Sequence, residues 1–336
     1  MITVCSRGIS NGLSKLYNDG FDFGPDTMLN ATLPNQYGPP YTKTSGLLEA
    51  VNYQQANGGK IQMTAGRFVI SPDAPLKQVT TSNVIGVPEY AVIPIYGGYN
   101  PVKAFNTSRI AGDTSSDTDV QTDYLNNTVD RRPDSNTTTV IDVSGLTNLP
   151  SGASVVLFGY YTLNQNLASS PEFINMHDFM IYTATPSTAG QNICGGYDFY
   201  LSCNCNVTNI TVYSTNNPGT TVFPANTVIG QVIDAGGAAT GWVDNLASRA
   251  MYYGFILGYH VHAGKLFNQA CYYGLVAYGD HGLEVDYYDT QGCIYAVYES
   301  PPFPWVCLYI HHWDGEYYAS PTENYNQTTD VYVGNV

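Results

Sequence analysis

The segment HGLEVDYYD, residues 281–289, carries the residue types that hydrolyse glycosidic bonds. Glu284 and Asp286 alternate along it, so a β-strand would place both carboxylates on one face. Glycoside hydrolases use two carboxyl groups about 5 to 9 Å apart, one as an acid and the other as a nucleophile or base. Asp280, His281 and Asp289 lie close to this pair in the sequence. These residues are candidate catalytic groups, although acidic side chains on any solvated strand would show the same pattern.

The charge of the chain disfavours two other classes of protein. A uronate lyase needs cationic side chains that hold the substrate carboxylate, but residues 133–336 contain only two cations, Arg249 and Lys265. The whole chain has 27 acidic and 12 basic residues and a formal net charge of −15, which repels nucleic acids and anionic lipids. We therefore expect no nucleic-acid partner, and a hydrolase rather than a lyase if the chain is an enzyme at all.

Histidines offer a second chemistry, the binding of a metal ion. His260 and His262 would share one face of a strand, and a second group of potential ligands follows near the C-terminal end. A metal site needs three or four converging ligands, and the sequence identifies no third ligand for either group. We therefore predict hydrogen-bonded histidines, no metal and no cofactor. The second group consists of His311, His312, Asp314 and Glu316.

The seven cysteines are an odd number, so at least one has no disulfide partner within the chain. Cys203 and Cys205 alternate in the segment CNC, which in a strand places both sulfurs on one face, too far apart for a comfortable disulfide. No CxxC spacing occurs that would indicate a zinc site. We predict that these cysteines are buried thiols.

Aromatic side chains give the stronger functional signal, because the chain has 29 tyrosines and 3 tryptophans. Flat amphipathic rings bury a large area at low entropic cost and suit sugar stacking or protein interfaces. Stacking inside or along the sheets is the alternative use. The predicted binding residues are Tyr272, Tyr278, Tyr287, Tyr288, Trp305 and Trp313, and the same aromatic set includes Trp242, Tyr252 and Tyr298.

A phrase that occurs three times predicts how these side chains are positioned. It reads SRAMYYGFILG at residues 248–258, NQACYYGLVAYG at 268–279 and TQGCIYAVYES at 290–300, with offsets of 20 and 22 residues. Alternating apolar positions in a unit of this length are typical of a β-solenoid, whose coils bury their inner faces by stacking. Three columns should therefore stack in consecutive coils: Met251, Cys271 and Cys293; Tyr253, Tyr273 and Tyr295; and Phe255, Leu275 and Val297.

The N-terminal part contains a helix followed by strands. Residues 44–71 read as a short amphipathic helix with Ser45 near its N-cap, a stop at Gly58-Gly59, and two strands joined by a turn at Ala65-Gly66. This order resembles the opening of the pectate-lyase-like superfamily of right-handed parallel β-helices, and Asn18–Thr27 is similar to the leader of viral tailspikes. The resemblance implies a helix that caps the exposed first coil.

One more segment, GDHG at residues 279–282, resembles the GHG motif of polygalacturonases with an aspartate inserted. The chain lacks their Asn-Thr-Asp and Arg-Ile-Lys motifs, so this likeness does little for the catalytic hypothesis.

The expected fold is all-β, a right-handed parallel β-helix with a short N-terminal capping helix. We predict an N-terminal arm over residues 1–43, the β-helix over 44–320 with a long polar loop over 103–138, and a tail strand over 321–336. No apolar stretch reaches the length of a membrane span, and no secretion leader is recognisable.

These patterns favour a structural protein of a virion surface or an extracellular surface, a spike, coat or fibre subunit that binds glycans or protein partners, including copies of itself. The alternatives are a polysaccharide-degrading enzyme and a secreted adhesin or filament subunit, whose C-terminal DVYVGNV could add a strand to another chain. Asn-x-Ser/Thr sites accord with an extracellular glycoprotein. They are Asn30, Asn106, Asn126, Asn136, Asn206, Asn209 and Asn326.

Overall fold

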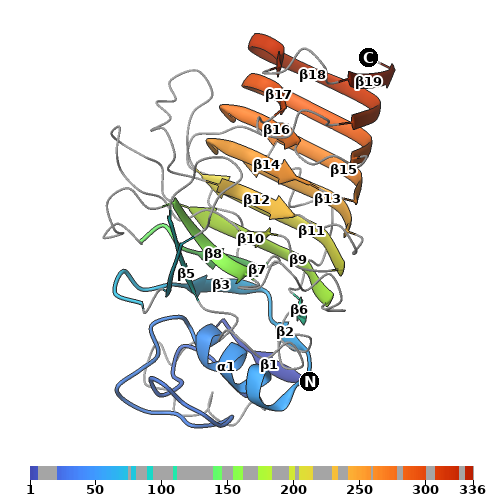
Figure 1. The fold of residues 1–336 in the computed structure, drawn as a ribbon. Coiled ribbons are helices and arrows are strands. Elements are labelled where there is room, and N and C mark those ends of the chain that lie inside the picture. The colour runs from blue at the N-terminus through green and yellow to red at the C-terminus, as the bar shows by residue number, and fades with distance from the viewer. Residues whose placement is uncertain are drawn as a thin grey trace.

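In its described residues the chain is all-β, with mostly parallel strands and one short helix (Figure 1). The computed structural model describes residues 1–6, 21–74, 77–80, 89–93, 109–111, 139–145, 154–161, 173–183, 197–200, 204–214, 229–233, 241–258, 260–277, 283–299, 307–324 and 330–335. Among the described strands every named pair is parallel except β4–β5. The elements are α1 (Leu47–Asn57), β1 (Ile2–Val4), β2 (Ile61–Met63), β3 (Gly66–Val69), β4 (Lys77–Thr80), β5 (Glu89–Ile93), β6 (Arg109–Ala111), β7 (Thr139–Asp142), β8 (Ser154–Tyr161), β9 (Phe173–Thr183), β10 (Tyr197–Tyr200), β11 (Asn204–Ser214), β12 (Ile229–Ile233), β13 (Gly241–Arg249), β14 (Tyr253–Leu257), β15 (Val261–Gln269), β16 (Tyr273–Ala277), β17 (Leu283–Glu299), β18 (Cys307–Asn324) and β19 (Asp330–Asn335).

Successive segments of the chain join three ladders in a recurring order. Face A contains β1, β2, β6, the first parts of β9, β11, β13, β15, β17 and β18, and finally β19. Face B contains β3 and β7, the second halves of β9, β11, β13 and β15, and the middle of β17 and β18. Face C contains β5, β8, β10, β12, β14, β16 and the ends of β17 and β18. This recurrence is compatible with a parallel β-solenoid.

The repeated phrase lies in the predicted register. Tyr253 pairs with Tyr273, and Tyr273 pairs with Tyr295, so Met251, Cys271 and Cys293 occupy equivalent positions in adjacent coils. All three side chains are fully buried, as are Phe255, Leu275 and Val297. The predicted stacking of these two apolar columns is confirmed.

The tyrosine column of the repeat stacks as predicted, with Tyr253 buried at the margin of the core. The rings of Tyr253 and Tyr273 lie 5.5 Å apart and those of Tyr273 and Tyr295 lie 5.4 Å apart. Tyr252 and Tyr272 form a parallel stack beside them at 4.9 Å. Tyr273 and Tyr295 are half-buried. These rings lie where the chain enters face C, and the two tyrosine stacks pack edge to face there.

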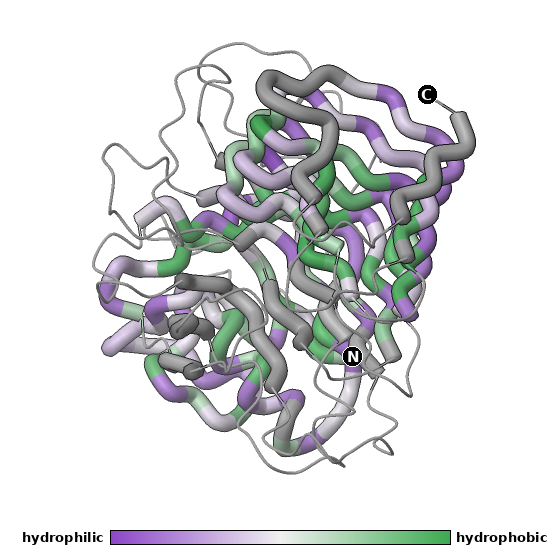
Figure 2. The backbone as a smooth tube through the Cα atoms, turned by 45° about the horizontal axis from the view of Figure 1, so that its top comes forward, coloured by the Kyte–Doolittle hydropathy of each residue, from purple (hydrophilic) through white to green (hydrophobic). Residues whose placement is uncertain are grey.

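One apolar core extends from β1 to β18 and includes the helix. Hydrophobic and hydrophilic segments lie beside one another in successive coils (Figure 2). Cys205, Cys271 and Cys293 are buried thiols, as predicted for Cys205, whereas Cys203 lies outside the described residues. Burial raises the pKa of the Cys271 thiol, and the adjacent Cys293 raises it further.

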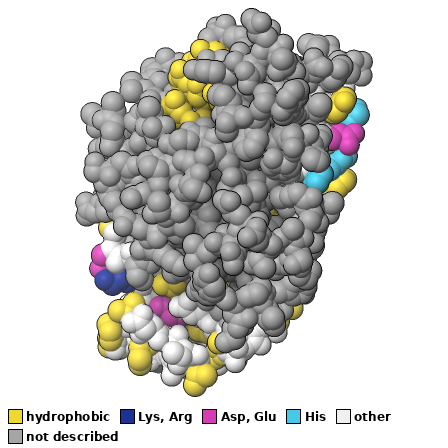
Figure 3. All heavy atoms as spheres, viewed as in Figure 1, with side chains coloured by type: hydrophobic (Ala, Val, Ile, Leu, Met, Phe, Trp, Pro, Cys, Tyr) yellow, Lys and Arg dark blue, Asp and Glu magenta, His cyan; other side chains and the backbone are white. Residues whose placement is uncertain are grey.

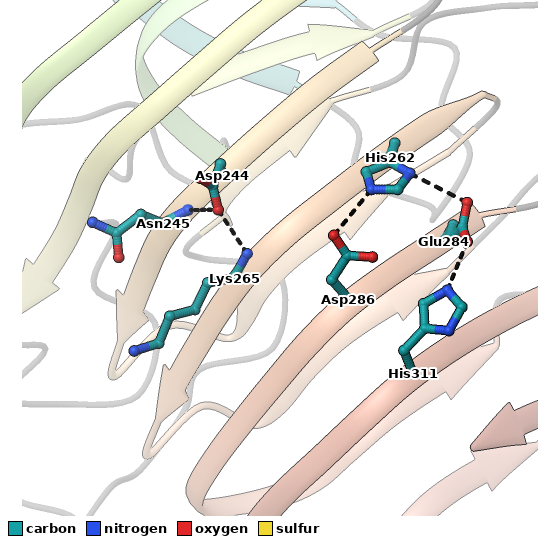
Figure 4. Close-up of polar contacts among 7 residues, drawn as sticks. All are labelled: Asp244, Asn245, His262, Lys265, Glu284, Asp286 and His311. Carbon is teal, nitrogen blue, oxygen red and sulfur yellow. Dashed lines mark hydrogen bonds and ion pairs between the residues drawn. The ribbon is translucent and has the colours of Figure 1, made fainter. Parts of the chain in front are cut away.

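A ladder of amide and carboxylate side chains marks the corner between faces A and B. Asp178, Asn209 and Asn245 all have positive φ, a conformation that Asn and Asp tolerate better than most residues. Asn209 Nδ2 donates to Asp178 Oδ1 and Asn245 Nδ2 donates to Asn209 Oδ1, each at 2.8 Å. At the next coil Asp244 Oδ1 instead accepts the backbone N–H of Lys265 at 2.8 Å (Figure 4).

A column of polar side chains is buried where face B meets the core. Ser248, Asn268 and Thr290 are in register on neighbouring strands, and all three are buried. Asn268 Nδ2 donates to the Tyr288 hydroxyl at 3.1 Å, and Trp313 Nε1 donates to Thr290 Oγ1 at 3.2 Å. Each of these bonds satisfies a polar group that would otherwise cost free energy in the core.

The helix α1 begins next to Ser45, which the sequence placed near the N-cap. Its N-cap is Gly46 with φ of 80°, and the Ser45 hydroxyl donates to the backbone oxygen of Val69 at 2.9 Å instead. A Cβ at position 46 would lie 2.6 Å from the backbone nitrogen of Gly24, so only glycine fits this close approach. The predicted glycine stop at Gly58 is present. Within the described residues, no helix has the length and apolar character that crossing a membrane would require.

The helix packs against β1 and β2 at one end of the strand stack (Figure 1). Leu47 is fully buried in the core, whereas Asn52 on the same helix is exposed. We predict that Leu47→Ala lowers the free energy of unfolding by about 2–5 kcal/mol, because it leaves a cavity in the core. Asn52→Ala should change it by less than about 0.5 kcal/mol. Urea denaturation measures both values, and equal stability of the two variants would contradict the packing of α1 into the core.

Candidate functional site

The outer side of face A brings together two histidines and two carboxylates. His262 lies on β15, Glu284 and Asp286 lie on β17, and His311 lies on β18 (Figure 4). The register places His262 beside Glu284 and His311 beside Asp286. Strand alternation exposes these side chains because their neighbours point into the core. The buried neighbours are Ala263, Val285 and Ile310.

The four side chains form one connected group. His262 Nδ1 lies 3.2 Å from Glu284 Oε2, and His262 Nε2 lies 3.2 Å from Asp286 Oδ2. The other oxygen of Glu284 lies 2.6 Å from His311 Nε2. One oxygen or nitrogen each from Glu284, Asp286 and His311 falls within 4.8 Å of the other two. We call these four residues the His–carboxylate cluster.

An exposed tryptophan extends the cluster along face A. Trp242 precedes His262 by one coil in the register, and the two rings stack at 4.5 Å with an interplanar angle of 3°. Trp242 is 49% exposed, and Tyr309, which pairs with Glu284 on the other side, is 43% exposed. Where β13, β15 and β17 reach the edge of the molecule, Figure 3 shows histidine and acidic side chains gathered with hydrophobic ones. An aromatic surface therefore flanks the charged groups.

The electrostatics of the cluster limit the chemistry that it can perform. Hydrogen bonding with His311, together with the nearby His262, lowers the pKa of Glu284. Glu284 is therefore a carboxylate at neutral pH, suited to accepting hydrogen bonds or binding a cation. A glycosidase acid needs the opposite shift, so Glu284 fits the role of a nucleophile or ligand better than that of the acid. Asp280 and His281 lie outside the described residues.

A second carboxylate pair lies on face B. Asp289 on β17 pairs in register with Asp314 on β18. Burial raises the pKa of Asp289, Asp314 raises it further, and Lys265 partly opposes both effects. This pair is separate in position from the His–carboxylate cluster, because face B follows the corner of the coil.

The predicted binding aromatics divide between surface and core. Tyr288 is fully buried and donates its hydroxyl proton to Ala296 O at 2.5 Å, and Trp313 is 7% exposed. Neither ring is available as a stacking surface for a ligand outside the sheets. Tyr287 is half-buried and stacks on His312 at 4.8 Å, and Tyr272 is half-buried in the tyrosine stack. Tyr278 and Trp305 lie outside the described residues.

The histidine groups seen in the sequence are rearranged by the fold. His260 precedes β15, and His312 stacks on Tyr287 in a column separate from that of His311. The side chain of Glu316 is outside the described part of the chain. The structure thus joins one histidine from each predicted group to the carboxylates of the catalytic hypothesis.

Three of the predicted glycosylation sites lie in the described residues. Asn30 is exposed, and Asn206 is half-buried on face A, beside Trp242 in the register. Asn209 donates from its amide nitrogen to Asp178 in the corner ladder, so a glycan on that nitrogen would have to fit beside this bond. Outside the described residues are Asn106, Asn126, Asn136 and Asn326.

Sequence reasoning missed the association of Trp242, His262 and Glu284, although a signal for it exists. The repeat offsets of 20 and 22 residues carry Trp242 to His262 and His262 to Glu284. Applying these offsets to the outward positions would have found the column. Because the offsets were applied only to the apolar positions, they identified the core columns and not this outward-facing column.

Comparison with models of protein families, with curated proteins and with solved structures finds no match to this chain. The function of the chain is therefore inferred from its own residues and their geometry.

The face B carboxylates generate a prediction about pH. The pKa of Asp289 is raised from its ordinary value of 3.8, so the folded chain binds this proton more tightly than the unfolded chain does. Stability then falls as pH rises from about 4 through the folded pKa. Asp289→Asn should make the protein more stable than wild type at pH 7, by less than about 1 kcal/mol because the group is partly exposed.

Melting temperatures of wild type and Asp289→Asn at pH 3.5 and pH 7 would check this expectation. The gain should shrink at the lower pH, and in an Asp314→Asn background it should also shrink, because Asp314 adds to the raised pKa. A variant less stable than wild type at pH 7 would contradict the assignment.

Proposed function

We propose that the chain is a right-handed parallel β-helix related to the pectate-lyase-like superfamily, and that it is a structural protein of a virion surface or an extracellular surface whose face A binds glycans. The recurring order of the three parallel ladders supports the β-helix. The helix that packs against the first strands supports the resemblance to capped β-helices.

The observation that carries the binding role is the exposed Trp242 next to the His–carboxylate cluster. A sugar ring presents C–H groups that pack on an indole face and hydroxyl groups that donate hydrogen bonds to carboxylates. Trp242 offers the first surface, while Glu284 and Asp286, both on β17 two coils further on, offer the second. Both kinds of contact are exposed on one flat ladder.

Binding fits the cluster better than polysaccharide cleavage does. The oxygens of Glu284 and Asp286 approach within 4.8 Å, close to the separation of about 5–5.5 Å in retaining glycosidases. However, the lowered pKa of Glu284 is the reverse of what a general acid requires. We therefore assign the carboxylates to ligand recognition.

The end of the strand stack supports a role in an assembly. The last strand, β19, pairs with β18 on one side, and the described residues provide no strand for its other edge. An exposed strand edge can pair with another chain. A second copy or another coat or fibre subunit would cover this edge.

The glycan-binding proposal predicts the effect of removing one ring. On an array of glycans, Trp242→Ala should weaken binding about tenfold or more, because it removes the stacking surface. Trp242→Phe should keep part of the affinity. The matched control is Tyr41→Ala, since Tyr41 is a comparably exposed aromatic residue (47%) in the N-terminal region.

Two results would overturn this assignment. If wild-type protein binds no glycan on a broad array, glycans are not its ligands. If Trp242→Ala and Tyr41→Ala lose equal affinity for glycans, Trp242 does not mark the binding site. Release of shortened sugars from bound glycans would instead favour the hydrolase alternative.

A further inference from the structure

The His–carboxylate cluster contains the donor set of a transition-metal site. Three neighbouring strands, β15, β17 and β18, each project a nitrogen or oxygen donor from the outer side of face A (Figure 4). Adjacent strands are about 4.8 Å apart, so side chains in one row can converge on a single ion. Glu284, Asp286 and His311 already hold their donor atoms within 4.8 Å of one another.

We propose that Glu284, Asp286 and His311 bind a divalent first-row transition metal of the Zn²⁺ class. Zinc takes histidine nitrogen and carboxylate oxygen at about 2.0–2.2 Å, which puts donors in a tetrahedral site about 3.4 Å apart. The gap between His311 and Glu284 is shorter than this, and the remaining gaps close with modest rotations of exposed side chains. Three protein ligands leave the fourth position of the ion open.

His262 holds the ligands in place from the other side. Its two ring nitrogens lie 3.2 Å from Glu284 and 3.2 Å from Asp286, so it contacts both carboxylates. Stacking on Trp242 fixes the plane of the imidazole. Hydrogen-bonding partners of this kind orient metal-binding carboxylates.

The donor chemistry selects the class of ion. Calcium takes six to eight oxygen ligands, and magnesium keeps most of its waters, so neither ion suits a site with an imidazole and two carboxylates. Imidazole together with carboxylate favours zinc and its neighbours in the first transition row. The Lys265 side chain points away from the cluster (Figure 4), and its ammonium group lies 5.7 Å from the centre of the Tyr287 ring.

The full chain is first freed of metal with a chelator. It is then titrated with ZnCl₂ in a calorimeter and, separately, with CoCl₂ in a spectrophotometer. Wild type should bind one equivalent of Zn²⁺, with a dissociation constant in the micromolar range or lower, and should give the visible absorption of low-coordinate Co²⁺. A large excess of Ca²⁺ should not displace either ion.

Matched variants locate the site. His311→Ala should weaken Zn²⁺ binding at least tenfold, and so should Glu284→Gln. The control is His312→Ala. Like His311→Ala it removes one histidine, but this histidine stacks on Tyr287 and lies outside the cluster. Circular dichroism of each variant would verify that the fold is kept.

Absence of a stoichiometric Zn²⁺ equivalent in wild type would overturn the proposal, and so would equal affinities of His311→Ala and His312→Ala. In that case hydrogen bonds alone would join the residues of the His–carboxylate cluster, without a metal ion. This inference does not rest on glycan binding, because the metal titration contains no glycan and leaves Trp242 unchanged.

Discussion

Register between parallel strands is the constraint on which the rest of this structure depends. Side chains alternate along each strand, so a slip of one residue would turn Val285 outward and Glu284 and Asp286 into the core. The same register between strands therefore determines both the packing of the core and the positions of the His–carboxylate cluster. Any coil that stacks its apolar positions correctly also brings the outward residues of neighbouring coils together.

Buried polar groups strengthen this alignment. Hydrophobic side chains alone would tolerate small shifts along the ladder, because apolar contacts have no fixed direction. The bonds of Asn268 to Tyr288 and of Trp313 to Thr290 exist only in one register, and losing a partner would leave a buried group unsatisfied. The same reasoning applies to the corner ladder of Asp178, Asn209 and Asn245.

The sequence predicted the parts of the fold that repeat. The columns of Met251 and Phe255 followed from alternation and a fixed offset, and the helix followed from its apolar spacing and glycine stop. The partial exposure of Tyr273 and Tyr295 was not predicted, because these rings lie where face C begins. The use of Gly46 as the N-cap was not predicted either, because a close backbone contact with Gly24 decides it. The cluster was missed because its members belong to three strands, and only the offset links them.

The corner ladder shows what this construction leaves unconstrained. Asp178 and Asn209 are 31 residues apart and Asn209 and Asn245 are 36 apart, whereas Asp244 reaches the backbone of Lys265 over only 21 residues. Rungs separated by very different lengths of chain thus meet at one spacing. The spacing of the rungs does not depend on the number of residues between them. The ladders therefore fix which residues face one another without fixing how many residues separate two rungs.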